Sequence, residues 1–231
     1  MQFLDTARQG NGFSNNDLKS ANVLLFKSER AQRFTWQVKV ADFGAACLAD
    51  SSQMRMMTTY AYAAPELLHA VIAQVTDHST TIPYTFASDI WSIGVILTEL
   101  LSANASHNMV TAADDPKYSF PEAYLMGTRV FLSTLGNHVQ MAITNDERGT
   151  DSTGLALAAV MAQPCPEKRF LAADALKHPR FTSSSLLSTP TRHGSRDLNT
   201  VTVEAAGLTL ARTICLLIGI QGCGLARRCL A

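Results

Sequence analysis

The chain has 231 residues with a hydrophobic content of 47%, and its 19 lysines and arginines balance 19 aspartates and glutamates. This hydrophobic content suffices for a globular core and excludes wholesale disorder. A formal charge of zero argues against an electrostatic nucleic-acid binder, because such a protein needs a basic excess to displace counterions. We therefore expect no nucleic-acid partner.

Cysteine usage and the N-terminal residues bear on the compartment. The five cysteines are odd in number and widely scattered, and no two of them form a zinc-binding C-x-x-C pair. This pattern favours a reducing compartment over a disulfide framework. Residues 1–5 lack the basic start and apolar run of a secretory signal. We therefore expect a cytoplasmic protein.

In chain order, the first regular elements expected are two short strands. Residues 23–26 (V-L-L-F) and 38–40 (V-K-V) have the apolar or alternating character of strands. The polar and charged residues 27–35 between them predict a hairpin loop. We interpret this loop as a solvated hairpin tip rather than a docking element.

The remaining predicted elements are helices. Over residues 89–101, apolar residues recur at helical spacing and cover most of the circumference. We therefore expect a helix that Asp89 caps and that is buried on nearly all sides. Further helices are predicted at residues 154–163, 172–177 and, within a stretch that is harder to interpret, 124–134.

Two polar motifs flank the predicted strands. The first, D-L-K-S-A-N, covers residues 17–22, and the second, D-F-G, covers residues 42–44. Phosphoryl transfer needs a carboxylate that orients the attacking hydroxyl and oxygen ligands that hold magnesium on the phosphates. The two motifs could supply a base, a phosphate-binding cation and metal ligands. Any one of these residues, taken alone, could equally be a turn or cap residue.

The order of the motifs along the chain points to a family. After D-F-G come T-Y-A-Y-A-A-P-E at residues 59–66, D-I-W-S-I-G at 89–94, C-P-E-K-R at 165–169 and K-H-P-R-F at 177–181. In this order the motifs resemble the C-terminal lobe of a eukaryotic protein kinase, over about residues 3–181.

The resemblance implies a fold and a domain division. The expected fold class is α+β, mainly α: a protein-kinase-like C-lobe without an N-lobe. We assign residues 1–182 to this lobe, because a Ser-, Thr- and Pro-rich linker begins near residue 182. Residues 183–231 are then a linker and an apolar tail of unknown structure.

The resemblance also implies roles for the polar residues. Asp17 is the expected catalytic base and Lys19 the expected phosphate-contacting lysine. Asn22 and Asp42 are the expected magnesium ligands and, with Lys19, bind the phosphates of ATP. Thr59 is expected beside the substrate hydroxyl.

A second set of residues has implied structural roles. Phe43 and Gly44 complete the D-F-G motif. Glu66 and Arg169 resemble a buried ion pair that holds the segment below the activation loop. Asp89 resembles the aspartate that supports the catalytic loop from beneath.

The implied activity is ATP- and magnesium-dependent phosphoryl transfer to a protein hydroxyl. A lysine two residues after the base and the threonine at position 59 follow the serine/threonine kinase pattern. The sequence D-L-K-S-A-N-V-L-L is similar to the corresponding motif of the tyrosine-kinase-like branch of these kinases. The expected partners are a nucleotide and a protein substrate.

The catalytic loop departs from the family pattern. Asn15 and Asn16 stand where the family has His-Arg before the catalytic aspartate. Asn15 replaces a histidine that packs on the D-F-G phenylalanine. Asn16 replaces the arginine that binds a phosphate on the activation loop, so phosphorylation of Ser51, Ser52 or Thr58 gains no obvious partner. We therefore expect little dependence on activation-loop phosphorylation.

The second departure lies upstream. Only 16 residues precede Asp17, which leaves no room for a glycine-rich loop, a strand lysine and a helix glutamate. We expect weak ATP affinity and an exposed apolar face on the lobe. Two hypotheses follow: a kinase whose sequence here is a truncated copy, or a catalytically inactive kinase-like lobe that acts as a binding or scaffold module.

The tail has an apolar stretch at residues 205–226, which Arg212 interrupts. A membrane span needs about 20 apolar residues, and a central arginine opposes insertion. We favour a helix that docks on the exposed lobe surface, or an unselected tail, over a membrane anchor.

Overall fold

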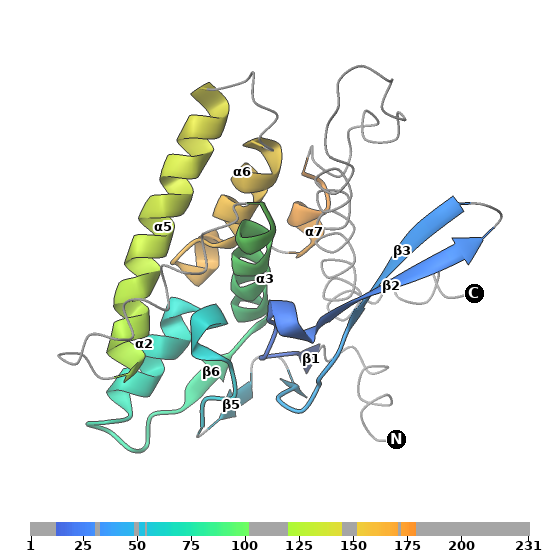
Figure 1. Ribbon diagram of the computed structural model, residues 1–231. Coiled ribbons are helices and arrows are strands. Elements are labelled where there is room, and N and C mark those ends of the chain that lie inside the picture. The colour runs from blue at the N-terminus through green and yellow to red at the C-terminus, as the bar shows by residue number, and fades with distance from the viewer. Residues whose placement is uncertain are drawn as a thin grey trace.

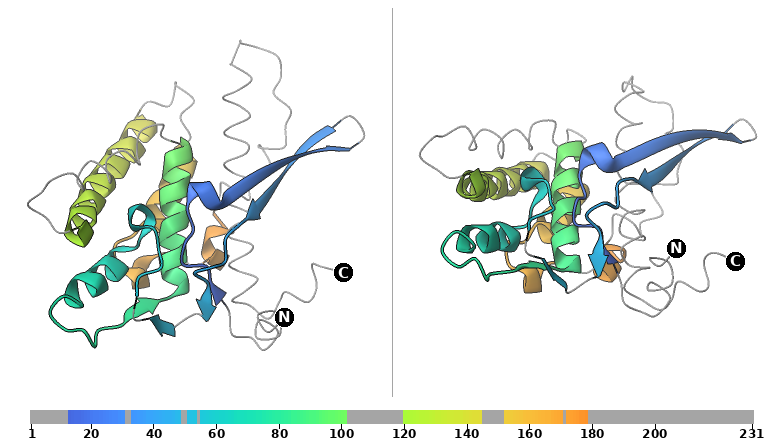
Figure 2. Two further views of the ribbon diagram at one scale, coloured as in Figure 1. Left: turned by 60° about the horizontal axis from the view of Figure 1, so that its bottom comes forward. Right: turned by 90° about the horizontal axis from the view of Figure 1, so that it is seen from below.

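The computed structural model describes residues 13–30, 33–48, 51–53, 55–101, 120–144, 152–170 and 172–178. Within these ranges helix outweighs strand, and the strands form three separate two-stranded sheets (Figure 1). The expected α+β, mainly helical fold is confirmed for these residues. Helix α3 lies at the centre, with α2 and α5 on one side of it and the β2–β3 ribbon projecting from the other (Figures 1 and 2).

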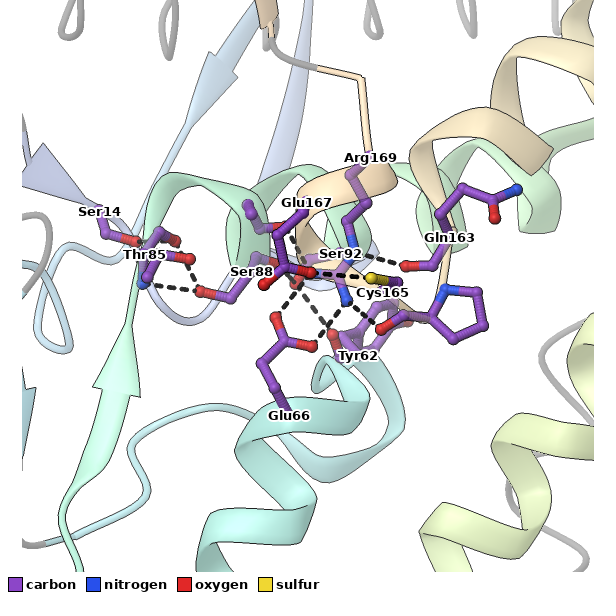
Figure 3. Close-up of polar contacts among 12 residues, drawn as sticks. Ser14, Tyr62, Glu66, Thr85, Ser88, Ser92, Gln163, Cys165, Glu167 and Arg169 are labelled. Carbon is purple, nitrogen blue, oxygen red and sulfur yellow. Dashed lines mark hydrogen bonds and ion pairs between the residues drawn. The ribbon is translucent and has the colours of Figure 1, made fainter.

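The central helix α3, Phe86–Leu101, carries most of the core. All residues from Ser88 to Thr98 are buried, as expected for a helix that is apolar nearly all round. It begins three residues before the predicted start, so Asp89 lies in the first turn and is not the cap. Instead, Ser88 Oγ donates to the carbonyl oxygen of Thr85 at 2.6 Å and accepts from the Thr85 amide at 3.1 Å (Figure 3).

Helices α6 and α5 pack around this centre. Helix α6, Ser152–Met161, packs against α3, where a Cβ on Gly94 would lie 2.9 Å from the Ala162 amide nitrogen. Helix α5, Phe120–Thr144, packs against α2 and α6 and is far longer than the predicted 124–134. Helix α6 is shifted two residues towards the N-terminus of the predicted range.

Two short helices complete this part of the fold. Helix α2, Pro65–Ala73, has no counterpart among the predicted elements. Pro65 occupies its first turn, where a fixed φ and a missing amide hydrogen cost nothing. Helix α7, Ala172–Ala175, is shorter than predicted. The 3-10 helices are η1 Ser20–Asn22, η2 Tyr60–Tyr62 and η5 Pro166–Lys168.

Strands β2, Val23–Arg30, and β3, Arg33–Val40, form the antiparallel ribbon. Its register runs from Val23 opposite Val40 to Arg30 opposite Arg33. The predicted strands were right in place but too short, and the predicted loop over 27–35 is wrong. The strands therefore extend through the polar and charged residues that were expected to form the loop.

Two smaller sheets join segments that are distant in sequence. Strand β1, Phe13–Ser14, pairs with β4, Cys47–Leu48, and Ser14 is opposite Cys47. Strand β5, Ser51–Gln53, pairs with β6, Ile82–Tyr84. The first sheet brings the segment after D-F-G beside the start of the D-L-K-S-A-N loop.

Within the described ranges, no helix is both long and apolar enough to cross a membrane. The apolar stretch at 205–226, expected to be a docking helix or an unselected tail rather than a membrane anchor, lies outside those ranges.

Candidate active site

Two predicted residues on the loop between β1 and β2 meet a third, Thr59, which lies just before η2. Lys19 Nζ donates to Asp17 Oδ2 at 2.7 Å and to Thr59 Oγ1 at 3.0 Å. Thr59 donates to Asp17 Oδ1 from its hydroxyl at 2.7 Å and from its amide at 2.9 Å. The carboxylate of Asp17 is therefore held on both oxygens, and the base, the lysine and the threonine form one hydrogen-bonded triad.

These contacts also affect the pKa of Asp17. Partial burial alone would raise the pKa of Asp17, but the hydrogen bonds from Lys19 and Thr59 and the charge of Lys19 outweigh it. The net effect lowers the pKa below its usual value. Asp17 is therefore ionised at neutral pH and can accept a hydrogen bond from a substrate hydroxyl.

The two predicted metal ligands lie at the same end of the ribbon. Asn22 immediately precedes β2 and Asp42 follows β3, and the Ala41 amide donates to the Asn22 carbonyl oxygen at 2.8 Å. Asn22 Nδ2 donates to the backbone carbonyl of Asp17 at 2.9 Å. The amide oxygen of Asn22 is thus the atom that could bind a metal.

Asp42 itself is exposed and has a positive φ of 59°. Its Oδ1 accepts from the Gly44 amide at 3.1 Å, and a Cβ on Gly44 would lie 3.1 Å from that oxygen. A carboxylate and an amide oxygen form the sparse set of hard ligands that magnesium takes together with phosphates and water. The described residues contain no group of three or more His, Cys, Asp or Glu that could hold a metal by themselves.

Asp89 supports the start of this loop from α3. Its Oδ2 accepts from Ser14 Oγ at 2.9 Å and from the Asn15 amide at 2.7 Å, and its Oδ1 accepts from the Asn16 amide at 2.9 Å. Burial raises the pKa of Asp89 to about 6, although these hydrogen bonds favour the charged form. Three donors on one enclosed carboxylate fix the backbone just before Asp17.

The two asparagines that depart from the family pattern are both buried. Asn15 Oδ1 accepts from the Asp17 amide at 3.2 Å, and Asn15 Nδ2 reaches the Asp42 carbonyl oxygen at 3.5 Å. Phe43, on which the family histidine would pack, is 54% exposed. Asn16 is bonded to three separate parts of the fold, which could not be predicted from the sequence.

Glu66 and Arg169 are brought together across 103 residues of sequence (Figure 3). Arg169 Nη1 and Nη2 donate to the two carboxylate oxygens of Glu66, each at 2.6 Å. The guanidinium also donates to three backbone carbonyls, of Ala87, Gln163 and Pro164. This one side chain thereby ties α2 to α3 and to the segment after α6.

A second polar cluster beside the site was not predicted. Tyr62 Oη donates to Glu99 Oε1 at 3.0 Å and lies 2.7 Å from Ser20 Oγ. Because the single Tyr62 proton is directed at Glu99, Ser20 is the donor in the second bond. The rings of Tyr60 and Tyr124 lie 5.5 Å apart. The alternating tyrosines of T-Y-A-Y were the only sequence signal for this cluster.

Comparisons with known proteins agree with the motif order. The model of the protein kinase domain matches residues 9–181. The serine/threonine-protein kinase dst2 of Dictyostelium discoideum is 30% identical over 179 residues, which cover 73% of this chain and 12% of that protein. The probable serine/threonine-protein kinase PBL5 of Arabidopsis thaliana is 30% identical over 175 residues, which cover 73% of this chain and 36% of that protein.

A third relative, the mitogen-activated protein kinase HOG1A of Wallemia ichthyophaga, is 27% identical over 179 residues, which cover 73% of this chain and 44% of that protein. Because the family model covers most of its length, the chain belongs to the protein kinase domain family. It spans less than half the length of each of these three relatives.

Proposed function

We propose that this chain is a serine/threonine protein kinase that transfers the terminal phosphoryl group of ATP to a hydroxyl of a protein substrate. The observation that carries the proposal is the triad of Asp17, Lys19 and Thr59. Asn22 is bonded to Asp17, and Asp42 follows the strand that pairs with the one after Asn22. A base, a cation and two oxygen ligands are what phosphoryl transfer requires of this part of an active site.

In this proposal each residue has a defined task. Asp17, kept ionised by Lys19 and Thr59, orients the substrate hydroxyl and accepts its proton. The charge of Lys19 balances the negative charge that spreads over the phosphoryl oxygens. Thr59, bonded to both residues, fixes the place of the substrate chain beside Asp17.

Asn22 and Asp42 would hold magnesium through one amide oxygen and one carboxylate. The metal supplies charge neutralisation on the phosphates of ATP. The chain's own contribution is to place these two oxygens. The turn from Asn22 into β2 and the hydrogen bond from the Gly44 amide set their positions.

We further propose that residues 1–182 form a C-terminal kinase lobe of the tyrosine-kinase-like branch. The motifs recognised between residues 17 and 181 are all motifs of that lobe, and the D-L-K-S-A-N-V-L-L wording supports the branch. ATP affinity is therefore the first quantity to measure.

A second candidate function is a kinase-like binding module without catalysis. The observation that favours it is the exposure of large apolar side chains near the site, namely Phe43 at 54% and Leu25 at 47%. Such surfaces are typical of faces that bind another polypeptide.

The two functions are separated by measuring magnesium-dependent ATP binding and transfer of labelled phosphate to a serine- and threonine-containing peptide library. We expect Asp17→Asn to lower transfer by about 100-fold or more while ATP still binds. Asp42→Asn should remove the magnesium dependence of binding. Asp174→Asn, in an exposed ion pair on α7, is the matched control and should change neither. A wild-type chain that neither binds nor transfers would favour the binding module.

A further inference from the structure

Asn16 is bonded to three separate parts of the fold. Its amide donates to Asp89 on α3 at 2.9 Å, and its carbonyl oxygen accepts from the Thr58 hydroxyl. Its side-chain Nδ2 donates to the Ala45 carbonyl oxygen and to Cys47 Sγ, each at 2.9 Å. The residue is 3% exposed, and its bonds to Asp89, Ala45 and Thr58 are buried.

The orientation of the Asn16 side chain follows from its partners. A carbonyl oxygen can only accept, so the group that faces Ala45 must be the amide nitrogen. The backbone of Asn16 has a φ of 67°, which asparagine tolerates better than most residues with a side chain.

The partners of Asn16 lie at the two ends of one segment. Ala45 and Cys47 come just after Asp42, the proposed magnesium ligand. Thr58 comes directly before Thr59, the proposed substrate neighbour. One residue therefore binds the beginning and the end of the segment that joins Asp42 to Thr59.

We propose that Asn16 is a positioning residue that clamps both ends of this segment and so keeps Asp42 and Thr59 in place without an activation-loop phosphate. The clamp is built from neutral hydrogen bonds, so it needs no cation and gains nothing from a phosphate. This inference rests on the proposed function, because it assigns Asn16 the task of arranging that site.

The first test removes the side chain of Asn16 and keeps its backbone free to adopt a positive φ. An Asn16→Gly variant loses the side-chain bonds to Ala45 and Cys47 but keeps the carbonyl oxygen that accepts from Thr58. We therefore expect hydrogen exchange of the Ala46 amide to accelerate about fivefold to tenfold, the factor that corresponds to one net hydrogen bond. Exchange of the Ala162 amide, which is bonded within the end of α6, should not change. Equal acceleration at Ala162, or none at Ala46, would contradict the clamp.

The second test uses the buried hydroxyl of Thr58, which is 7% exposed. Thr58→Val keeps the shape and loses the donor, whereas Thr58→Ser loses a methyl group and keeps the donor. If the hydroxyl clamps Asn16, the serine variant keeps slow exchange of the Thr59 amide and the valine variant does not. A residue that acts only through packing would give the opposite order, and that order would overturn the proposal.

Activity separates this inference from the proposed function. We expect the wild-type transfer rate to be unchanged by phosphatase treatment and the Asn16→Gly and Thr58→Val rates to be lowered. A wild-type rate that falls on dephosphorylation would contradict the clamp. Absence of transfer in every variant, with the expected exchange pattern, would support the clamp and reject the kinase function of this chain.

Discussion

The carboxylate of Asp89 is 1% exposed and bears three hydrogen bonds, yet its pKa is raised to about 6 because burial outweighs them. A folded-state pKa above the ordinary value of 3.8 means that folding favours the protonated form. The associated contribution to stability is complete below about pH 4 and is lost as the pH rises through 6.

We therefore expect the Asp89 contribution to the free energy of unfolding to fall by roughly 3 kcal/mol between about pH 4 and pH 7. Asp17, whose pKa is lowered, acts in the opposite sense and loses its contribution as the pH falls. Urea unfolding of the wild type and of Asp89→Asn measures their free energies of unfolding across this pH range. The difference between the two proteins isolates the contribution of Asp89. A difference that does not vary with pH would show that Asp89 does not titrate there.

At the scale of elements, the contact of α3 with α6 depends on the absence of one side chain. A Cβ at Gly94 would lie 2.9 Å from the Ala162 amide nitrogen and 3.1 Å from Met161. A backbone atom cannot move aside as the end of a flexible side chain can, so the two helices would have to separate.

We expect Gly94→Ala to destabilise the protein by about 1–3 kcal/mol, in spite of the better helix propensity of alanine. Gly136→Ala is the matched control, since a Cβ there has no neighbour within 4 Å among the described residues. That control should stabilise α5 by up to about 1 kcal/mol. Thermal unfolding of both variants measures the contrast, and similar behaviour of the two would contradict close packing at Gly94.

Arg169 links separate elements of the fold, because it is bonded to Glu66 on α2 and to Ala87 on α3. We expect Arg169→Ala to cost about 3–5 kcal/mol, because it leaves the Glu66 carboxylate and three carbonyls without their donor. Lys177→Ala removes an exposed pair with Asp174 and should cost less than about 1 kcal/mol. Chemical unfolding of the two variants tests the difference, and equal costs would show that burial adds nothing.

At the scale of the whole molecule, the β2–β3 ribbon presents apolar side chains on both faces. Leu24, Leu25 and Phe26 are 41%, 47% and 44% exposed, and successive residues of a strand point to opposite faces. Lys39 Nζ lies 4.9 Å from the centre of the Phe26 ring and covers part of one face. The ribbon therefore carries exposed apolar side chains, and the apolar face expected where an N-lobe would pack stays a prediction.

We expect Leu25→Lys to reduce self-association of the protein and to leave its stability within about 0.5 kcal/mol. Val75→Lys replaces a valine that is 72% exposed away from the ribbon and should not change association. Light scattering over a concentration series measures both variants. Reduced association in the Val75 variant as well would assign the effect to charge alone.

Much of the candidate site could be predicted, because residues that are close together within one loop stay close in space whatever the rest of the fold. Asp17, Lys19 and Asn22 are neighbours in sequence, and their contacts follow from one short loop. The clamp at Asn16 could not be predicted, since it depends on a positive φ and on partners brought close by β1–β4 pairing. The Tyr62 cluster likewise depends on Glu99, 37 residues away.

The fold was predicted best where burial dominates. The apolar residues of α3 cover its circumference, so its existence was clear and only its start was misplaced. Helix α5 was underestimated because its exposed positions allow the helix to continue through polar residues. The ribbon was underestimated because its strands extend into the charged stretch that resembled a loop. Helix α2 was missed, since nine residues beginning with proline give little periodic signal.

The 103-residue separation of Glu66 and Arg169 also has a kinetic meaning. A contact between such distant residues forms only after the chain between them has been ordered, because closing a long loop costs conformational entropy. We therefore expect the pair to be absent from the folding transition state, so that Arg169→Ala accelerates unfolding and leaves the refolding rate nearly unchanged. The ion pair then determines the unfolding rate, and so the lifetime of the native state, but not the folding rate.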